Sequence, residues 1–346
     1  MKILVTGATG FIGRHLVRHL VASHHTVRAM VRPTSNTQAL PSDLEWVYAT
    51  LDDHHALQQA VDGVDAVIHL ASLLKVPWKP EFHDVNVNGT RRLLEVCAHR
   101  STPPIFIFVS SLAAAGTALD AKGRREDEIP MPVSIYGRAK RAAEAIVDDY
   151  AHCVPCSIIR PPMVFGPGDP ASLPLFQSTA RGIHLVPRWA PMRVSSIFVL
   201  DLCAAIEQVT LSGVRRTGRC GDGTGKGIYF AASDEVVTYA EFGHRVGAAA
   251  GRHRVRVIRL PSWISFLGAC LSELWARLRD RRHVLNRDKW REATAGDWTC
   301  SAERLKTELG WHTQYSLNES LSLTAQSYAK AGVLRMRGTQ ERPGDA

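Results

Sequence analysis

The chain has few of the features that mark secreted, membrane-spanning or metal-dependent proteins. Its 346 residues include seven cysteines, an odd number scattered along the sequence, which argues against a disulfide framework. Cys153 and Cys156 form a single CxxC that runs straight into an expected strand, so we predict no metal or redox site there. The first expected strand begins at Ile3, which predicts no signal peptide. Together these absences favour a reducing, cytoplasmic location.

Acidic residues are in deficit. The sequence holds 42 Lys and Arg against 33 Asp and Glu, a formal net charge of +9. Between Arg245 and Lys306 the counts are 14 against 6, so the excess belongs to the carboxy-terminal third. Basic strands with interleaved aromatic residues are missing, so nucleic acid is not an expected partner. Anionic lipid, a phosphorylated substrate and plain solvent remain as alternatives.

Long hydrophobic runs are also missing. The most apolar helical pattern, Pro261 to Leu278, is too short and too interrupted to predict a membrane span. A basic cluster follows it directly, made of Arg277, Arg279, Arg281 and Arg282. Three interpretations of residues 261–282 stay open: a cover over a substrate pocket, a subunit interface, or peripheral contact with an anionic membrane.

The most informative stretch is the amino terminus. Ile3 to Val5 form a short apolar run typical of a buried parallel strand, and a helical pattern begins at Phe11. Glycines spaced three apart in the intervening turn allow a sharp bend and a close approach to phosphate. The helix amino terminus adds free N–H groups and a positive dipole end. We therefore predict dinucleotide binding by Gly7, Thr9, Gly10, Phe11, Ile12 and Gly13.

Strand and helix patterns alternate over the first half of the chain. Expected strands cover residues 27–31, 46–48, 66–70, 105–109 and 156–159, with helices at 82–98 and 135–150 among them. This alternation predicts an α/β fold with a doubly wound parallel sheet. Ligands of such sheets lie beyond the carboxyl ends of the strands. Five residues fall at those ends, so one cleft should collect Gly10, Arg32, Ala71, Ser111 and Pro162.

Two domains are expected. Residues 1–161 should form the dinucleotide-binding domain, and 162–334 a smaller carboxy-terminal substrate domain, with the segment near 195–212 returning to the first. Short strands are expected at 197–199 and 228–231. Residues 335–346 are polar and predict a disordered tail.

The end of the second strand bears on cofactor choice. An acidic residue there holds the 2′-hydroxyl of NAD, whereas a basic one accommodates the 2′-phosphate of NADP. The acid is missing, and Arg32 begins the segment Arg-Pro-Thr-Ser-Asn that includes Ser35. We favour NADP(H), with NAD(H) open if Arg32 simply faces solvent.

A tyrosine and a lysine carry the expected chemistry. Tyr136 and Lys140 stand four apart on an expected helix and so share a face, and Ser111 ends a strand of the same sheet. Tyrosine has an ordinary pKa of about 10. A neighbouring ammonium and the positive nicotinamide ring should lower that pKa. Tyr136 could then exchange a proton with a substrate oxygen held by Ser111 while the cofactor exchanges hydride.

Several motifs, in order, give the chain a family resemblance. TGATGFIG at 6–13, HLAS at 69–72, NVNGT at 86–90, VSS at 109–111, YGRAK at 136–140 and RPPMVFGPGD at 160–169 resemble the extended short-chain dehydrogenases/reductases. The resemblance implies a Rossmann domain, a nicotinamide cofactor, a homodimer, and Ser111, Tyr136 and Lys140 as catalytic residues. It also implies that Lys140 binds the nicotinamide ribose and that Asn86 lies near the catalytic end. Further cofactor contacts implied by it are Leu70, Ala71, Ser72, Pro161 and Met163.

Two departures refine the resemblance. Thr50 and Leu51 occupy the slot where many extended members carry an Asp for the adenine amine. The run TVRAMVRPTSN at 26–36 is more similar to the NADP-using branch, which includes dihydroflavonol-reductase-like and 3β-hydroxysteroid-dehydrogenase-like proteins. The tail segment with Leu285 to Lys289, Trp298 and Glu308 to Trp311 is similar to bacterial members of that branch.

The leading hypothesis is therefore an NADP(H)-dependent oxidoreductase that interconverts a ketone and a secondary alcohol on a fairly apolar small molecule. The alternative is an NAD-dependent nucleotide-sugar epimerase or dehydratase using the same three residues. A third hypothesis, dinucleotide binding without chemistry, has no use for an intact Ser111, Tyr136 and Lys140 set.

Overall fold

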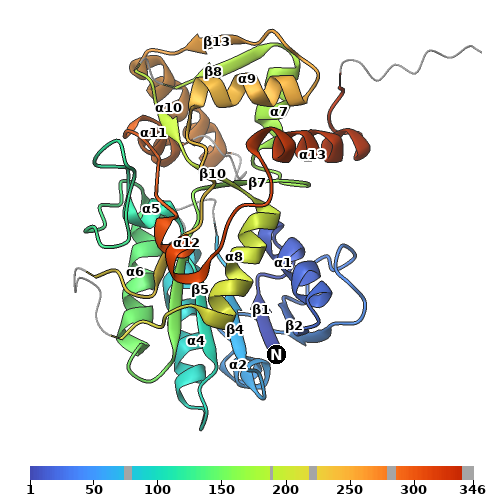
Figure 1. Ribbon diagram of the computed structural model, residues 1–346, viewed down its shortest axis with the longest axis vertical. Coiled ribbons are helices and arrows are strands. Elements are labelled where there is room, and N and C mark those ends of the chain that lie inside the picture. Colours follow the sequence, from blue (N-terminus) through green and yellow to red (C-terminus); the bar gives the residue numbers. More distant parts are fainter. Residues whose placement is uncertain (74–79, 188–189, 218–223, 279–285, 337–346) are drawn as a thin grey trace, which may run out of the picture.

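A seven-stranded parallel sheet forms the lower half of the molecule as seen in Figure 1. The computed structural model describes all residues except 74–79, 188–189, 218–223, 279–285 and 337–346. The strand order is β11-β6-β5-β4-β1-β2-β3, and every neighbouring pair is parallel. The strands are β1 (Lys2–Thr6), β2 (Thr26–Val31), β3 (Glu45–Tyr48), β4 (Ala66–His69), β5 (Ile105–Val109), β6 (Cys156–Arg160) and β11 (Ile228–Phe230). The predicted doubly wound parallel sheet is confirmed, and the strand order reverses beside β1, where such sheets bind ligands.

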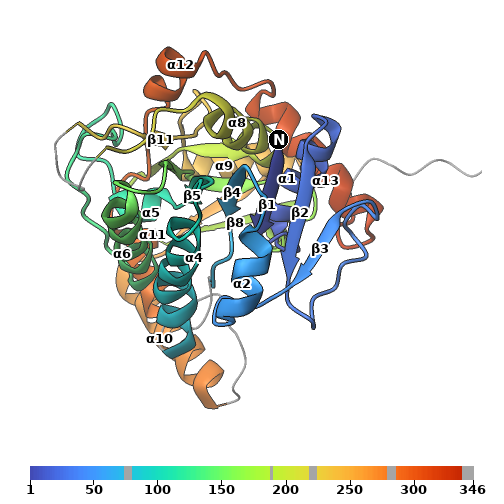
Figure 2. The ribbon, with the colours of Figure 1, turned by 90° about the horizontal axis from the view of Figure 1, so that it is seen from below.

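Helices cover both faces of the sheet and enclose separate cores (Figure 2). On one face lie α2 (His54–Val61), α4 (Gly89–Ala98) and α6 (Ile135–Tyr150). On the other lie α1 (Phe11–Ala22) and α8 (Val199–Ser212), which pack against each other. The helix expected over residues 82–98 is instead three consecutive pieces, because a π-helical turn, η1 (Asp84–Asn88), separates α3 (Pro80–His83) from α4.

A smaller assembly lies beyond the carboxyl ends of the strands, at the top of Figure 1. It contains three strand pairs: β7 (Met163–Phe165) with β10 (Ser196–Phe198), β9 (Arg193–Val194) with β12 (Val237–Thr238), and β8 (Ile183–Val186) with β13 (Arg256–Arg259). Helices α7 (Leu173–Ala180), α9 (Tyr239–Ala249) and α13 (Leu317–Lys330) share an aromatic core with them that includes Phe165, Phe176 and Phe242. The expected tail at 335–346 lies almost entirely outside the described residues.

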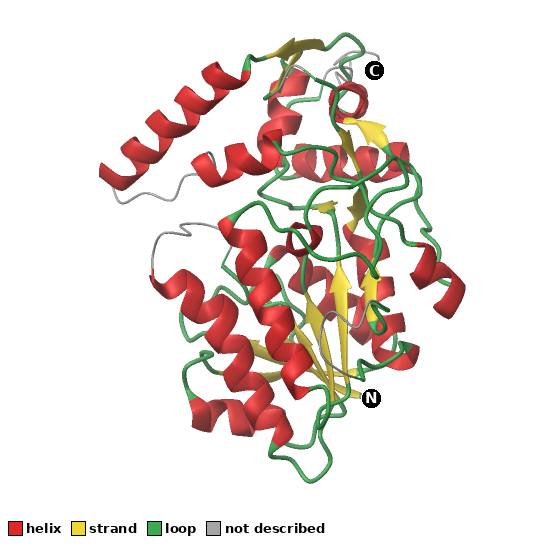
Figure 3. Cartoon of the chain, turned by 90° about the vertical axis from the view of Figure 1, so that its left-hand side faces the viewer, coloured by secondary structure: helices red, strands yellow, loops and turns green. Residues whose placement is uncertain are grey.

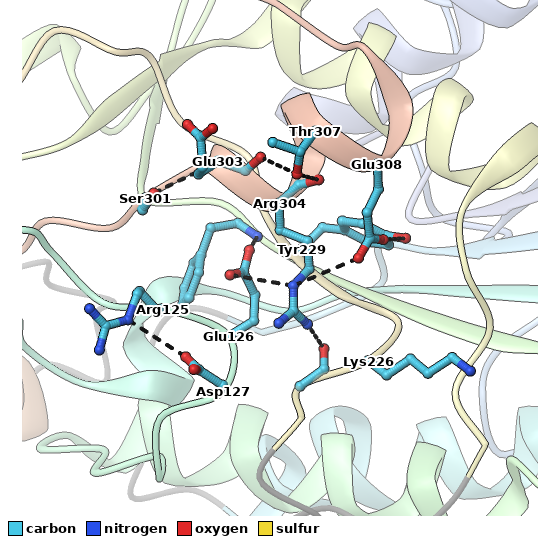
Figure 4. Close-up of polar contacts among 12 residues, drawn as sticks. Arg125, Glu126, Asp127, Lys226, Tyr229, Ser301, Glu303, Arg304, Thr307 and Glu308 are labelled. Carbon is cyan, nitrogen blue, oxygen red and sulfur yellow. Dashed lines mark hydrogen bonds and ion pairs between the residues drawn. The ribbon is translucent and has the colours of Figure 1, made fainter.

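The chain returns twice from this assembly to the main sheet. Helix α8 packs on α1, and β11 pairs with β6 as the edge strand. A polar cluster around α12 (Glu303–Leu309) fixes that edge (Figure 4). The Tyr229 hydroxyl donates to Glu308 at 2.7 Å, the Phe230 N–H donates to Glu126 at 2.9 Å, and Arg304 lies 3.9 Å from the Glu126 carboxylate. Segments from beyond residue 162 therefore complete the sheet.

Candidate active site

The turn between β1 and α1 approaches the backbone after β4 very closely. A Cβ on Gly7, whose φ is +71°, would lie 2.8 Å from the Ala71 nitrogen, and one on Gly13 would lie 2.2 Å from the Gly7 carbonyl oxygen. Gly10 occupies the N-cap of α1 and makes no side-chain cap hydrogen bond. The N–H groups of the first helical turn have no partner within the helix and are therefore left for a ligand. Backbone N–H groups at a helix amino terminus, with no Cβ in the way, fit a pyrophosphate.

A buried histidine connects this turn to the next strand. The His69 ring lies between the hydroxyls of Thr6, at 2.7 Å, and Thr90, at 3.1 Å. Burial, with a smaller effect of the Lys140 charge, lowers the His69 pKa to about 3, so the ring is neutral and bridges the two hydroxyls. Thr6 also accepts a hydrogen bond from the Ala71 N–H at 3.2 Å. Leu70, Ala71 and Ser72 are thereby fixed beside the glycine turn.

Asn86 lies in the π-helical turn and is buried. Its Oδ1 accepts hydrogen bonds from the Ser72 hydroxyl, at 2.7 Å, and the Leu73 N–H, at 2.8 Å, while its Nδ2 donates to the Leu73 carbonyl at 3.0 Å. A π turn at a functional site commonly redirects one side chain. Here it directs an amide to the segment that follows β4, and the Asn86 side chain fixes the backbone of that segment at Leu73.

The remaining cofactor candidates spread along the sheet edge. Arg32 is exposed at the end of β2, and its carbonyl accepts the Ser35 N–H at 2.9 Å. Leu51 is buried after β3 and packs against Gly89, where a Cβ would lie 2.7 Å from the leucine Cδ1, whereas Thr50 is partly exposed. These four residues lie on the β2–β3 side of the glycine turn, apart from the catalytic candidates.

Ser111 and Tyr136 are brought together at the other side of the cleft. Ser111 follows β5 and caps α5 (Leu112–Ala115), accepting the Ala113 N–H at 3.1 Å, and its side chain lies close to that of Tyr136. The Pro161 carbonyl accepts the Leu112 N–H at 2.8 Å, which fixes α5 against the end of β6. Burial raises the pKa of Tyr136 well above its usual range, the Glu292 charge adds to that rise, and the nearby Ser111 side chain opposes it.

Lys140 lies one turn along α6 and is buried. Its ammonium donates to the Val109 carbonyl at 2.9 Å and lies 4.8 Å from the centre of the Phe108 ring. Burial lowers its pKa to about 8, partly offset by Glu144. The predicted lowering of the Tyr136 pKa by Lys140 is wrong for the chain alone, because burial dominates at Tyr136 and Lys140 is turned toward β5. The phenol is therefore the protonated form at neutral pH.

Helix α6 is anchored at its amino terminus and again near its middle. Asp288, from α11 (Arg287–Thr294), accepts the backbone N–H groups of Ile135, at 2.7 Å, and Tyr136, at 3.4 Å. Farther along the helix, the buried Glu144 accepts hydrogen bonds from Ser110, at 2.6 Å, and Arg160, at 2.7 Å. An acidic residue at a helix amino terminus stabilises the helix dipole. Asp288 therefore holds the backbone that carries the tyrosine.

A cavity of about 410 Å³ opens beside Ser111 and Tyr136. Most of its wall is apolar; it is lined by Ser111, Leu112, Ala113, Tyr136, Pro162, Met163, Pro187, Met192, Val194, Ser195, Tyr239, Lys289, Glu292, Ala293 and Trp298. Lys289 and Glu292 form an ion pair of 2.6 Å in this wall, and the Lys289 ammonium lies 5.6 Å from the Tyr136 ring centre. The second carboxylate oxygen of Glu292 is buried without a hydrogen-bond partner among the described residues.

Sequence reasoning missed five of these residues. His69 and Thr90 belong to motifs that carried the family resemblance, so their network could have been sought there. Asp288 and Lys289 belong to a tail segment whose likeness to bacterial relatives was noted without a role. Glu292 gave no signal, because its importance depends on which helix packs against Tyr136.

Comparison with known proteins agrees with this geometry. The sequence model of the NAD dependent epimerase/dehydratase family matches residues 3–190. A ceramide reductase of Caulobacter vibrioides is 32% identical over 343 residues, which is 96% of each chain. A 3 beta-hydroxysteroid dehydrogenase/Delta 5→4-isomerase of Mycobacterium tuberculosis is 28% identical over 273 residues, 72% of this chain and 70% of its own.

Solved structures share the fold. UDP-glucose 4-epimerase of Thermus thermophilus, in complex with NAD, superposes with a TM-score of 0.73 at 22% identity, covering 96% of this chain and all of its own. At that identity the likeness concerns architecture. The family match over more than half of the chain and the end-to-end similarity to a reductase are more specific. The chain therefore belongs to the NAD dependent epimerase/dehydratase family of extended short-chain dehydrogenases/reductases, among relatives that are reductases and dehydrogenases.

Proposed function

We propose that the protein is an NADP(H)-dependent reductase that interconverts a ketone and a secondary alcohol on a largely apolar molecule. One observation carries the proposal: a protonated Tyr136 and Ser111 line the same mainly apolar cavity, in a chain whose first turn is a glycine turn of the dinucleotide type. The glycine contacts and the exposed helix terminus fit a pyrophosphate. When bound, the nicotinamide supplies hydride to the substrate carbon or accepts it.

The chain's own residues handle the proton and the substrate oxygen. The Tyr136 phenol donates its proton to the carbonyl oxygen as that oxygen gains charge, and Ser111 donates a second hydrogen bond to the same oxygen. In the reverse direction the phenolate accepts the proton of the alcohol. Lys140, whose ammonium donates to the Val109 carbonyl, would hold the nicotinamide ribose, and a positive nicotinamide would favour the phenolate.

The cavity favours an apolar substrate. A nucleotide sugar presents many hydroxyls and two phosphates, whereas the wall supplies proline, methionine, valine and tryptophan side chains with few polar groups. The named relatives include a ceramide reductase and a hydroxysteroid dehydrogenase, and both names describe lipid substrates. We therefore place the substrate among lipids that carry a ketone or a secondary alcohol.

Arg32 supports the choice of NADP(H). Its side chain is exposed at the end of β2, where a guanidinium can pair with a 2′-phosphate, and no acid stands there to hold a 2′-hydroxyl. Replacement by aspartate should repel the phosphate and admit the free ribose.

The test combines binding and turnover. Purified protein is titrated with NADPH and NADH, and cofactor consumption is followed with a long-chain ketone, a steroid ketone and UDP-glucose. We expect NADPH to bind about tenfold tighter or more, Arg32→Asp to abolish that margin, and a lipid ketone to consume NADPH stoichiometrically. Arg181→Asp, at an exposed arginine of the smaller assembly, is the matched control. Tightly retained NAD with conversion of UDP-glucose and no net cofactor turnover would contradict the proposal.

A further inference from the structure

Helix α10 (Ser262–Leu278) presents an apolar stripe to solvent. Trp263, Leu267, Leu271 and Trp275 follow one another at intervals of four residues, so they lie along one face, and all four are exposed. Trp263 is 69% exposed and Leu271 is 59% exposed, high values for side chains of this size. Figure 3 shows α10 reaching outward from the end of the molecule opposite the main sheet.

The neighbouring strand pair continues the apolar surface. In β8 the side chains of Ile183 and Leu185 are exposed, while His184 and Val186 are buried. The register pairs Ile183 with Arg256 and Leu185 with Ile258, so these four side chains share the outer face. Leu260 and Pro261 alone separate β13 from α10, and both elements lie at the top of Figure 1.

Positive charge surrounds this surface. No Asp or Glu occurs between Glu241 and Glu273, whereas the same stretch holds Arg245, Arg252, Arg254, Arg256 and Arg259. Arg254, Arg256 and Arg259 are exposed. The arginines at 279, 281 and 282 that sequence analysis noted lie outside the described residues. Within the described part of the chain, no helix has the length and apolarity needed to cross a bilayer.

The inner side of α10 contacts the wall of the substrate cavity. The Ser265 hydroxyl donates to the carbonyl of Pro187, a cavity-lining residue, at 3.0 Å. The Trp290 indole donates to the same hydroxyl at 3.0 Å, and the Phe266 ring packs edge-on against Trp290 with centroids 4.8 Å apart. Trp290 belongs to α11, which contributes Lys289 and Glu292 to the cavity.

From these observations we propose that the outer faces of α10, β8 and β13 dock on an anionic lipid bilayer. Trp and Leu side chains on a surface helix bury in the headgroup boundary, and arginines beside them pair with lipid phosphates. The charge favours lipid over a second copy of the chain, because a two-fold interface through this face would bring the basic rims of both copies together. Docking places the cavity wall at the interface, which matters if the proposed lipid substrate is correct; the docking itself does not depend on the reaction.

Vesicle co-sedimentation tests the surface directly. Full-length protein is mixed with two kinds of vesicle, at low and at high salt. One kind is pure phosphatidylcholine, and the other contains about one third phosphatidylglycerol. We expect binding to the anionic vesicles to exceed binding to the neutral ones by about tenfold or more, and to weaken as salt rises. Trp263→Ser with Leu271→Ser should lower binding by about tenfold or more. Arg254→Glu with Arg256→Glu, at two exposed arginines of this surface, should remove the preference for anionic lipid.

Controls distinguish docking through this surface from nonspecific binding through exposed apolar side chains and from misfolding. Leu119→Ser with Ile129→Ser removes two apolar side chains that are 64% and 81% exposed on a loop elsewhere, and it should bind vesicles like the natural chain. Circular dichroism and sedimentation velocity are recorded for every variant. Failure of the natural chain to bind anionic vesicles, or equal binding by the Trp263/Leu271 and Leu119/Ile129 variants, would overturn the proposal. The proposal would also be overturned if the natural chain were a dimer, the Trp263/Leu271 variant were a monomer, and neither protein bound vesicles. That result would show a self-association surface.

Discussion

The two sides of the cleft are built in different ways. The cofactor side is built mainly on one stretch of sequence, since the glycine turn joins β1 to the helix that follows it, and His69 comes from β4, the strand beside β1 in the sheet. The cavity side gathers residues from Pro187, Met192, Tyr239 and α11, which lie far apart along the chain. The first side has the close backbone contacts of a glycine turn, and the second forms the largely apolar wall of the cavity. We infer that the cofactor side and Tyr136 decide whether the enzyme reacts, while the wall decides what it accepts.

The largest expected effect is at the junction of the two sides. Tyr136→Phe removes the only hydroxyl that we assign as proton donor, so kcat should fall by about 10³-fold with every substrate while cofactor affinity is retained. Turnover and NADPH titration measure the two quantities. Tyr150→Phe is the matched control. It removes a hydroxyl on the same helix, one that donates to Glu95 at 3.4 Å. A Tyr136→Phe variant with undiminished turnover would remove the tyrosine from the mechanism.

A smaller but still substrate-independent effect is expected in the glycine turn. In Gly13→Ala the new methyl would lie 2.2 Å from the Gly7 carbonyl oxygen, so the helix must move away from the turn. We expect cofactor affinity to fall by about 10- to 100-fold, with a loss of about 1–3 kcal/mol in the free energy of unfolding. NADPH titration and thermal unfolding provide the measurements.

Gly268→Ala is the control for that change. A Cβ at Gly268 meets no atom within 4 Å among the described residues, and alanine should stabilise helix α10 by up to about 1 kcal/mol. Cofactor affinity should be unchanged in this variant. If both alanine variants weaken the cofactor equally, close packing of the turn is not what the glycines provide.

The same contrast explains what the sequence could predict. The first six strands of the sheet were predictable because they are short local patterns, and β1, β3 and β4 are each followed directly by a helix. The edge strand β11 was not predicted to join them, because its pairing with β6 joins segments about 70 residues apart in sequence. The site of Tyr136 and Ser111 was predictable because strand ends meet at one edge. By contrast, β7, β8 and β13 are three or four residues long, and their pairings join distant segments. The raised Tyr136 pKa of the chain alone could not be predicted, because it depends on burial and on Glu292 of α11, and no local pattern shows that contact.

Asp288 tests whether the wall also influences the chemistry. Its carboxylate accepts the N–H groups of Ile135 and Tyr136 although it belongs to α11. We expect Asp288→Ala to lower kcat about tenfold with little change in cofactor affinity, and Asp288→Asn, which keeps one acceptor oxygen, to restore part of it. Steady-state kinetics separates kcat from KM.

A second cap serves as the control for Asp288. Asp53 caps α2 by accepting the Ala56 N–H at 3.0 Å, and it does not line the cavity. Asp53→Ala should cost a similar free energy of unfolding, about 1 kcal/mol, and leave kcat unchanged. Equal kcat in both alanine variants would make Asp288 a stabilising cap with no positioning role.

The smallest expected effect is at Glu292, and it should depend on substrate and pH. Burial is the main cause of the raised Tyr136 pKa, and the Glu292 carboxylate adds to it, so Glu292→Gln lowers that pKa. Alcohol oxidation requires the phenolate and rises with pH through this pKa, so its rising limb should move to lower pH by about a few tenths to one unit. One Glu292 oxygen lies in the cavity wall without a hydrogen-bond partner among the described residues. The change in kcat/KM should therefore be about 3- to 10-fold and largest for substrates with a hydrogen-bond donor near the ketone.

Glu235→Gln is the control. It removes the carboxylate of another ion pair, with Arg245, that lies outside the cavity, and it should leave the pH profile unchanged. A limb that stays fixed or moves to higher pH in Glu292→Gln would mean that the wall selects substrates without influencing the tyrosine, which would sharpen the division between the two sides.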